Sequence, residues 1–269
     1  MLKRLLVPLL VLLLAVPLVV VAAGCGGPSA EQIAKNSMRA SESIDTLNFK
    51  IDSQQQLPRA PIEQGKVAKQ KYYNNSSGAV DQKTGNLQVK LDLAPGVPVT
   101  ALQVDKKLYI QLAGTWYVMP QSFQLPAPVT QTLSISQYVK YFKTLNKLGN
   151  TSVDGESCYH LQGVPDMKAL IKLPGITDLL KDPATGKQIR TVDELADSKA
   201  VFDFYIRTKD YYMKQSKALI EVRATEDLIK LGYAEAGDRV KLQQQTTLSK
   251  YNEKLNLEPP SNSKPWPNQ

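Results

Sequence analysis

The sequence predicts an α+β protein whose largest element is an antiparallel β-sheet with one buried face and one face in water. The main observation is a period of two, since apolar and polar residues alternate in several runs along the chain, as they do in half-buried strands. Turn signals such as Asp154 followed by Gly155 separate these runs, and short turns join antiparallel neighbours. Elsewhere apolar residues recur at helical spacing, so we expect helices to pack against the sheet.

The chain begins with a segment that has the composition of a secretory leader. Two basic residues stand near its start, residues 5–23 carry no charge, and small residues precede Cys25. This pattern predicts a signal peptide over residues 1–24. An uncharged run of this length could also form a membrane-spanning helix, but Pro8 and Pro17 within it disfavour a regular one.

The segment Ala22–Cys25 (AAGC) resembles a bacterial lipobox, in which the cysteine becomes the lipid-modified first residue after cleavage. We therefore expect lipid on Cys25, a flexible tether over residues 25–30, and a protein held at the extracytoplasmic face of the cell membrane. Two alternatives remain at this point. The segment could be a plain signal or anchor, or Cys25 could form a disulfide with Cys158.

Catalytic and metal-binding patterns are missing from the sequence. If Cys25 carries lipid, Cys158 is a lone thiol, which is most often a buried small apolar residue. The chain has no Cys-x-x-Cys pair and no Cys/His cluster, and its single histidine, His160, is expected on the solvent face of a strand. No nucleophile elbow, phosphate loop or dinucleotide-binding glycine pattern accompanies it. The sequence thus predicts a non-enzymatic protein without metal or cofactor.

The charge of the chain is weakly basic. The formal net charge is +8, and the basic residues are spread along the chain without a Lys/Arg block. Such an excess is compatible with an anionic membrane surface. No basic cluster or RNA-binding aromatic motif accompanies it, so nucleic acid is not an expected partner.

After the tether, an amphipathic helix is expected over residues 31–44, because Ile33, Ala34 and Met38 fall near one face. Strands are expected where the period of two recurs, at Leu47–Asp52, Leu87–Leu93, Leu108–Leu112, Phe202–Ile206, Ala218–Ala224 and Val240–Leu242.

Two helical stretches interrupt the strands. Residues 134–148 and 166–180 place apolar residues at helical spacing, and Pro174 with Gly175 breaks the second stretch. Both stretches can be ordinary helices packed on the sheet, or the broken one can be a mobile lid. A polar loop (182–187) and a short helix (191–196) follow. Three lysines, Lys140, Lys143 and Lys147, share one side of the first stretch, where they face either anionic head groups or plain solvent.

The order of these elements, the lipobox and three short segments together resemble the LppX/LprAFG branch of the LolA-like bacterial lipoproteins. The segments are Gly114–Tyr117, Val153–Leu161 and Tyr251–Pro260. The resemblance covers roughly residues 30–260 and implies a single domain over residues 31–260. It implies an unclosed half-barrel, in which a strongly curved antiparallel sheet has helices covering its concave face.

The same resemblance implies a function in lipid binding or lipid transfer, with acyl chains held in an apolar cavity between the sheet and the helices. Periodicity alone suggests lining residues, each of which can equally be an ordinary core residue: Phe142, Leu145, Leu170, Ile171, Ile176, Phe202 and Phe204. The expected partners are a lipid or acylated ligand, the membrane through the anchor, and a membrane transporter or receptor. The alternative is an extracytoplasmic sensor or protein-interaction module of the same fold without lipid cargo.

The Pro-rich tail over residues 261–269 places Pro265 and Pro267 around Trp266. Such a segment is expected to be an extended strap or disordered.

Overall fold

One large open sheet dominates the computed structural model, which describes residues 27–59, 62–63, 66–67, 71–94, 97–120, 139–170, 197–224, 226–230 and 232–267. Its strands are β1 (Thr46–Gln56), β4 (Lys71–Asp81), β5 (Leu87–Ala94), β6 (Val97–Val104), β7 (Lys107–Leu112), β8 (Thr115–Val118), β9 (Phe142–Val153), β10 (Glu156–Pro165), β11 (Lys199–Arg207), β12 (Met213–Arg223), β13 (Arg239–Ser249) and β14 (Lys264–Pro265). A separate small sheet pairs β2 (Ile62–Glu63) with β3 (Lys66–Val67).

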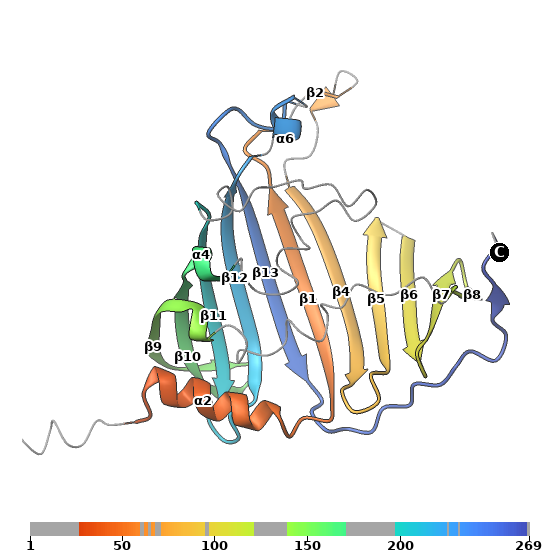
Figure 1. Cartoon of the computed structure of the whole chain (residues 1–269), viewed down its shortest axis with the longest axis horizontal. Coiled ribbons are helices and arrows are strands. Elements are labelled where there is room, and N and C mark those ends of the chain that lie inside the picture. Colours follow the sequence, from red (N-terminus) through yellow and green to blue (C-terminus); the bar gives the residue numbers. More distant parts are fainter. Residues whose placement is uncertain are drawn as a thin grey trace, which may run out of the picture.

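The strand order is β14-β8-β7-β6-β5-β4-β1-β13-β12-β11-β10-β9, so the sheet runs from one edge to the other without closing (Figure 1). All neighbours are antiparallel except β14, which pairs with β8 in parallel. Two-residue turns join several of them, with both turn residues at positive φ, as in Asp154 (49°) and Gly155 (79°) between β9 and β10. Such turns match the twist of adjacent strands. The predicted α+β class and open antiparallel sheet are therefore confirmed, whereas a helical cover over the concave face is not shown by the described residues.

The sheet has two chemically different faces. On the helix face, which carries α2 (Ala30–Ser41), alternate residues such as Phe49, Val89 and Leu161 are buried in one cluster with Ile33 of α2. The side chain of Ser29 begins α2 by accepting a hydrogen bond from the backbone N–H of Gln32 at 3.2 Å. On β4, β1 and β11–β13 the opposite face carries mostly the intervening polar residues, whereas on β6–β8 it carries a second apolar cluster, in which Leu102, Val104 and Tyr109 are buried beside Leu257. The predicted alternation and the helix predicted near residues 31–44 are both confirmed.

The helix predicted over residues 134–148 is wrong for the part that the structure describes. A single 3₁₀ turn, Val139–Tyr141, leads into the strand β9. Two β-bulges explain the error, because β10 skips one residue of β9 at Lys143 and another at Leu148. A bulge places residues three apart on the same face, so Phe142 and Leu145 imitate helical spacing within a strand.

The second predicted helix is described only at its start. Met167–Leu170 form the short helix α4, and residues 171–180 lie outside the described residues, as do the loop and short helix predicted at 182–187 and 191–196. A further short helix, α6 (Glu226–Lys230), lies near the end of the sheet that is remote from α2 (Figure 1). Among the described residues, no helix has the length and apolar composition needed to cross a bilayer.

The tail lies along the far edge of the sheet. Lys264 and Pro265 pair with Tyr117 and Val118 of β8. The ring of Trp266 meets that of Tyr117 edge-on, with 5.7 Å between the centroids. The expectation of an extended strap therefore holds at Lys264 and Pro265, which pair with β8, whereas residues 261–262 form a turn.

Candidate functional site

Four of the seven predicted cavity residues come together on the helix face. The rings of Phe142, Phe202 and Phe204 form an aromatic cluster, in which the Phe142 centroid lies 5.9 Å from that of Phe202 and 5.7 Å from that of Phe204. Both pairs are edge-to-face, the favoured arrangement of aromatic rings. Leu145 packs against the same apolar core. Strands β9 and β11, which lie on either side of β10, supply these residues.

Gly163 in β10 makes the aromatic cluster possible. It lies opposite Leu145 on one side and Phe202 on the other. A Cβ atom built at Gly163 would stand 2.8 Å from the Phe142 ring, closer than van der Waals contact allows. The absence of a side chain on β10 therefore leaves room for the ring contributed by β9.

Burial differs within this group. Phe204 is only 5% exposed, whereas Phe142, Leu145 and Phe202 are half-buried. The backbone of Leu170 ends α4, but its side chain lies outside the described part, as do Ile171 and Ile176. That these residues line a lipid cavity stays a prediction.

The described part of the tether lies against the edge strand β9. The ammonium of Lys147 donates to the carbonyl of Pro28 at 3.4 Å and lies 5.2 Å from the ring centroid of Tyr159. Lys147 therefore does not project from a helix, as the sequence suggested, but holds the tether beside β9 through a charge-assisted hydrogen bond. The described chain begins at Gly27, beside Lys147 at this edge of the sheet.

A half-buried cluster of charged residues fixes the neighbouring end of the sheet. The guanidinium of Arg207 donates to both carboxylate oxygens of Asp210 and to Glu156. It also lies 5.2 Å from the ring centroid of Tyr212 and 5.0 Å from that of Tyr251, and these two rings contact each other. Burial acts to lower the pKa of Arg207, but these two carboxylates outweigh it and hold the pKa above its ordinary value. The charge of Arg207 is neutralised by Asp210 and Glu156 within the fold, so these three residues have a structural role, and we call them the structural lock.

The segment that begins at Tyr251 completes this lock. The Tyr251 hydroxyl donates to the carbonyl of Met213, and burial raises the pKa of Tyr251. The next residue, Asn252, accepts from the backbone N–H of Asp45 at 2.7 Å and donates to the carbonyl of Ser43 at 3.2 Å. Tyr251 therefore joins the end of β13 to the start of β12, and Asn252 joins it to the connection between α2 and β1.

Cys158 and His160 are candidates for reactive side chains, but neither is activated. Cys158 is free and 0% exposed, and burial raises the pKa of its thiol, which disfavours the reactive thiolate. His160 stacks on Tyr205 with 4.6 Å between ring centroids, and its Nε2 lies 2.8 Å from Asp203 Oδ1. It is half-buried on the opposite face, as the strand parity predicted. In the described part of the chain, no group of three or more His, Cys, Asp or Glu side chains could hold a metal ion.

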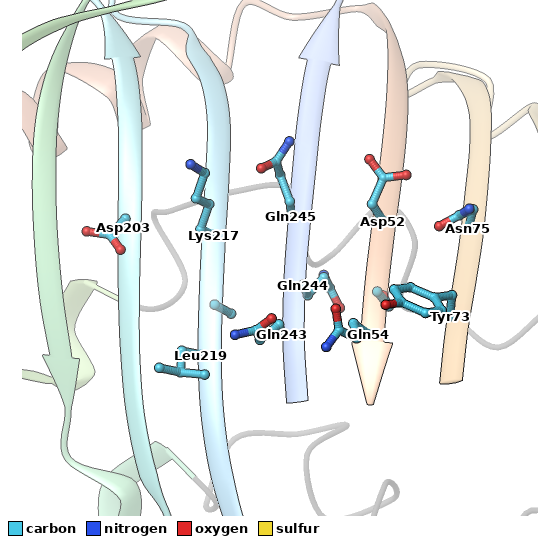
Figure 2. Close-up of a pocket in the computed structure, with 12 residues that line it drawn as sticks. Asp52, Gln54, Tyr73, Asn75, Asp203, Lys217, Leu219, Gln243, Gln244 and Gln245 are labelled. Carbon is cyan, nitrogen blue, oxygen red and sulfur yellow. The ribbon is translucent and has the colours of Figure 1, made fainter. Parts of the chain in front are cut away.

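The sequence did not suggest a hollow of about 440 Å³ that lies on the opposite face. Figure 2 shows its side chains projecting from neighbouring strands toward one space. Most of them are polar: Asp52, Gln54, Asn75, Asp203, Lys217, Gln243 and Gln245, with Tyr73 and Leu219 beside them. Alternation predicted that such residues face away from the core, but no spacing along the chain indicated that they gather.

Comparison with known proteins gives matches among solved structures alone. No known protein family matches the chain, and no curated protein matches it. The chain is similar to bacterial lipoproteins. For the crystal structure of lipoprotein LppX from Mycobacterium tuberculosis, identity is 10%, 87% of this chain and 100% of that chain are covered, and the TM-score is 0.49.

Two further structures give a similar result. For LprF from Mycobacterium bovis, identity is 15%, the coverage is 87% and 99%, and the TM-score is 0.48. For a LolA superfamily protein from Nitrosomonas europaea, identity is 9%, 86% of this chain and 96% of that chain are covered, and the TM-score is 0.29. LppX-type and LolA-like proteins, which the sequence was expected to resemble, are thus among the structures to which this chain is similar, each with a TM-score below 0.5.

Proposed function

We propose that this chain is a lipoprotein anchored through Cys25 at the extracytoplasmic face of the cell membrane, and that it binds a lipid or acylated ligand without catalysis. The observation that carries the proposal is the aromatic cluster of Phe142, Phe202 and Phe204. Phe142 and Phe202 remain partly exposed on the helix face, close to the strand that holds the tether. An apolar surface in this position is suited to an acyl chain that leaves the bilayer nearby.

The energetics favour such a ligand. Removing apolar surface from water stabilises a complex by about 25 cal/mol per Å², or about 0.8 kcal/mol per methylene group. A few methylene groups placed on the aromatic cluster therefore supply several kcal/mol. In this proposal helices cover the concave face, as the sequence predicts for residues 166–180, and the acyl chain lies between them and the sheet.

Lipid content tests the proposal directly. The full chain is extracted from membranes in detergent, purified, and its bound lipids are measured by mass spectrometry after organic extraction. We expect a stoichiometric lipid and saturable uptake of a fluorescent fatty-acid probe. A chain that repeatedly carries no lipid and takes up no probe contradicts the proposal, and specific capture of one defined protein partner by such a chain would favour the sensor or interaction module.

A matched pair of variants locates the site. Phe202→Gln puts a polar amide into the aromatic cluster and is expected to weaken probe binding at least tenfold, which corresponds to about 1.4 kcal/mol. Leu148→Ala alters an exposed side chain of β9 and is expected to leave binding unchanged. If the two substitutions weakened probe binding equally, the aromatic cluster would not be part of the binding site.

Intact mass tests the anchor separately. The membrane-extracted chain is expected to lack residues 1–24 and to carry added lipid mass, while Cys25→Ser is expected to carry none. An unmodified Cys25 in the membrane-extracted protein would overturn the anchor while leaving the binding test valid.

A further inference from the structure

Two rows of side chains cross the opposite face of the sheet, one residue from each strand. The polar row consists of Asn75, Asp52, Gln245, Lys217 and Asp203, which are direct cross-strand partners on β4, β1, β13, β12 and β11. The contact row consists of Tyr73, Gln54, Gln243 and Leu219, paired in the same way on the first four of these strands. Both rows line the hollow, and Figure 2 shows them as two parallel lines.

The size of the surface follows from strand geometry. Neighbouring strands lie about 4.8 Å apart, so the polar row extends over roughly 19 Å, and the rows are separated by the roughly 6.7 Å that two residues span. This surface is long and shallow. It fits an extended ligand that lies across the strands rather than a compact one.

The contact row contains large apolar side chains that are exposed to solvent. Four large hydrophobic side chains are exposed in the described part of the chain, and Tyr73 (67%) and Leu219 (39%) are two of them. A third, Val164 (39%), lies on the same face of β10. Exposed apolar side chains set among polar groups on one surface are a feature of binding sites.

The charges in and beside the polar row balance, because the carboxylates of Asp52 and Asp203 are matched in number by Lys217 and by Lys50. Asp52 accepts from Lys50 at 2.8 Å, and Lys217 lies 5.3 Å from the ring centroid of Tyr205. Asp203 Oδ1 accepts from Gln162 at 3.1 Å and lies 2.8 Å from the imidazole of His160. The surface is therefore nearly neutral, although the chain as a whole is basic.

Four ligand classes fit this surface poorly. A phosphate-bearing ligand needs several lysines or arginines, and Lys217 is the sole cation among the residues that line the hollow. An acyl chain or an amphipathic helix needs a continuous apolar stripe, whereas Gln54 and Gln243 interrupt this one. An added peptide strand needs a free edge, and every strand that contributes to the rows is interior to the sheet.

We propose that the polar row and the contact row form a binding site for a neutral oligosaccharide. Amide side chains both donate and accept hydrogen bonds, as sugar hydroxyls do, and Asp203 supplies a carboxylate oriented by two neighbours. The ring of Tyr73 and the methyl groups of Leu219 offer apolar contacts to the C–H face of a sugar. The site lies on the face opposite the aromatic cluster, so this inference stands without the lipid-binding proposal.

Titration calorimetry on the full chain tests the site, in a zwitterionic detergent without a sugar head group. The probes are four neutral hexasaccharides: maltohexaose, cellohexaose, mannohexaose and hexa-N-acetylchitohexaose. We expect saturable binding of at least one, with an affinity that changes less than twofold between 50 and 500 mM NaCl, because no net charge is neutralised.

Three variants separate the site from the rest of the surface. Tyr73→Ala and the double substitution Gln54→Ala/Gln243→Ala are each expected to weaken binding at least tenfold. Gln88→Ala is the matched control, because it removes an amide from the opposite face of β5, outside both rows. All three are expected to keep the thermal midpoint and the fatty-acid uptake of the unaltered chain.

Several results would overturn the inference. One is that no hexasaccharide binds at millimolar concentration. Another is that Gln88→Ala weakens binding as much as the row variants do. A third is that sedimentation shows a dimer that Tyr73→Ala disperses, since the rows would then be covered by a second copy of the chain.

Discussion

At Gly78 of β4 the helix face has no room for any side chain. A Cβ atom placed there would stand 2.0 Å from the carbonyl oxygen of Gln88 and 2.7 Å from the ring of Phe49. The first contact is with backbone of the paired strand β5, which cannot turn aside as a side chain can. Glycine at this position therefore sets how closely β4 and β5 approach under the core.

Gly78→Ala is expected to destabilise the protein by about 1–3 kcal/mol or more, in the range of overpacked core substitutions. The free energy of unfolding from urea titration measures the effect. Ser77→Ala, on the opposite face of the same strand, is the control and is expected to change stability by less than about 0.5 kcal/mol. A Gly78→Ala protein as stable as the control would mean that β4 and β5 separate at little cost.

Among the elements, β9 and the C-terminal strap illustrate where sequence reasoning succeeds and fails. Regular strands such as β5 and β7 were predictable, because their period of two is uninterrupted. In β9 the two bulges replace that period with a spacing of three, and no local sequence signal distinguishes this from a helix. The bulges depend on the partner strand, so information from β10 is needed to recognise them.

The same distinction applies to the candidate sites. Phe202 and Phe204 were predictable as inward residues of a regular strand, and Phe142 and Leu145 were predicted on a helix yet still fall on the helix face. The two rows were not predictable, because each residue in them is an ordinary outward position. Their alignment depends on the register of five strands distant in sequence.

Trp266→Ala is expected to release the strap from the edge of the sheet. The indole packs against Ala101, Leu108 and Met119 and is partly buried, so the cost is expected to be about 1–3 kcal/mol, below that of a fully buried tryptophan. Amide hydrogen exchange in β8 is expected to accelerate, since β14 covers that edge. Pro267→Ala is the control, and unchanged exchange in β8 would contradict a protective role of the strap.

Across the whole molecule, three turn and strand-end carboxylates connect stability to pH. The backbone N–H of Thr84 holds the pKa of Asp81 below its ordinary value, and a hydrogen bond from Arg223 does so for Asp197. For Glu156, burial acts to raise the pKa, but Lys209, Arg207 and Lys214 outweigh it and lower the pKa. All three carboxylates therefore bind protons less readily in the folded state than in the unfolded state.

The sign of the effect follows from this difference. The stability that these three carboxylates contribute is fully present above their unfolded pKa values of 3.8 and 4.5. It is lost as the pH falls through their lower pKa values in the folded state. The urea midpoint is expected to be constant near neutrality and to fall below about pH 5.

Glu156→Gln is expected to lower the midpoint at pH 7 and to reduce its fall between about pH 5 and pH 3. The exposed carboxylate Glu258, changed to glutamine, serves as the control. A Glu156→Gln protein with the full acid sensitivity of the unaltered chain would show that Glu156 contributes nothing to it.

The two ends of the described chain lie at opposite edges of the sheet (Figure 1). Gly27 is beside Lys147 of β9, and Trp266 lies on Tyr117 of β8. Along a flat sheet these edges would be separated by at most roughly 53 Å, and rolling toward a closed barrel would shorten that separation. The distance between two dyes, one attached near each terminus, would therefore report the curvature of the sheet and any change in it when a ligand is added.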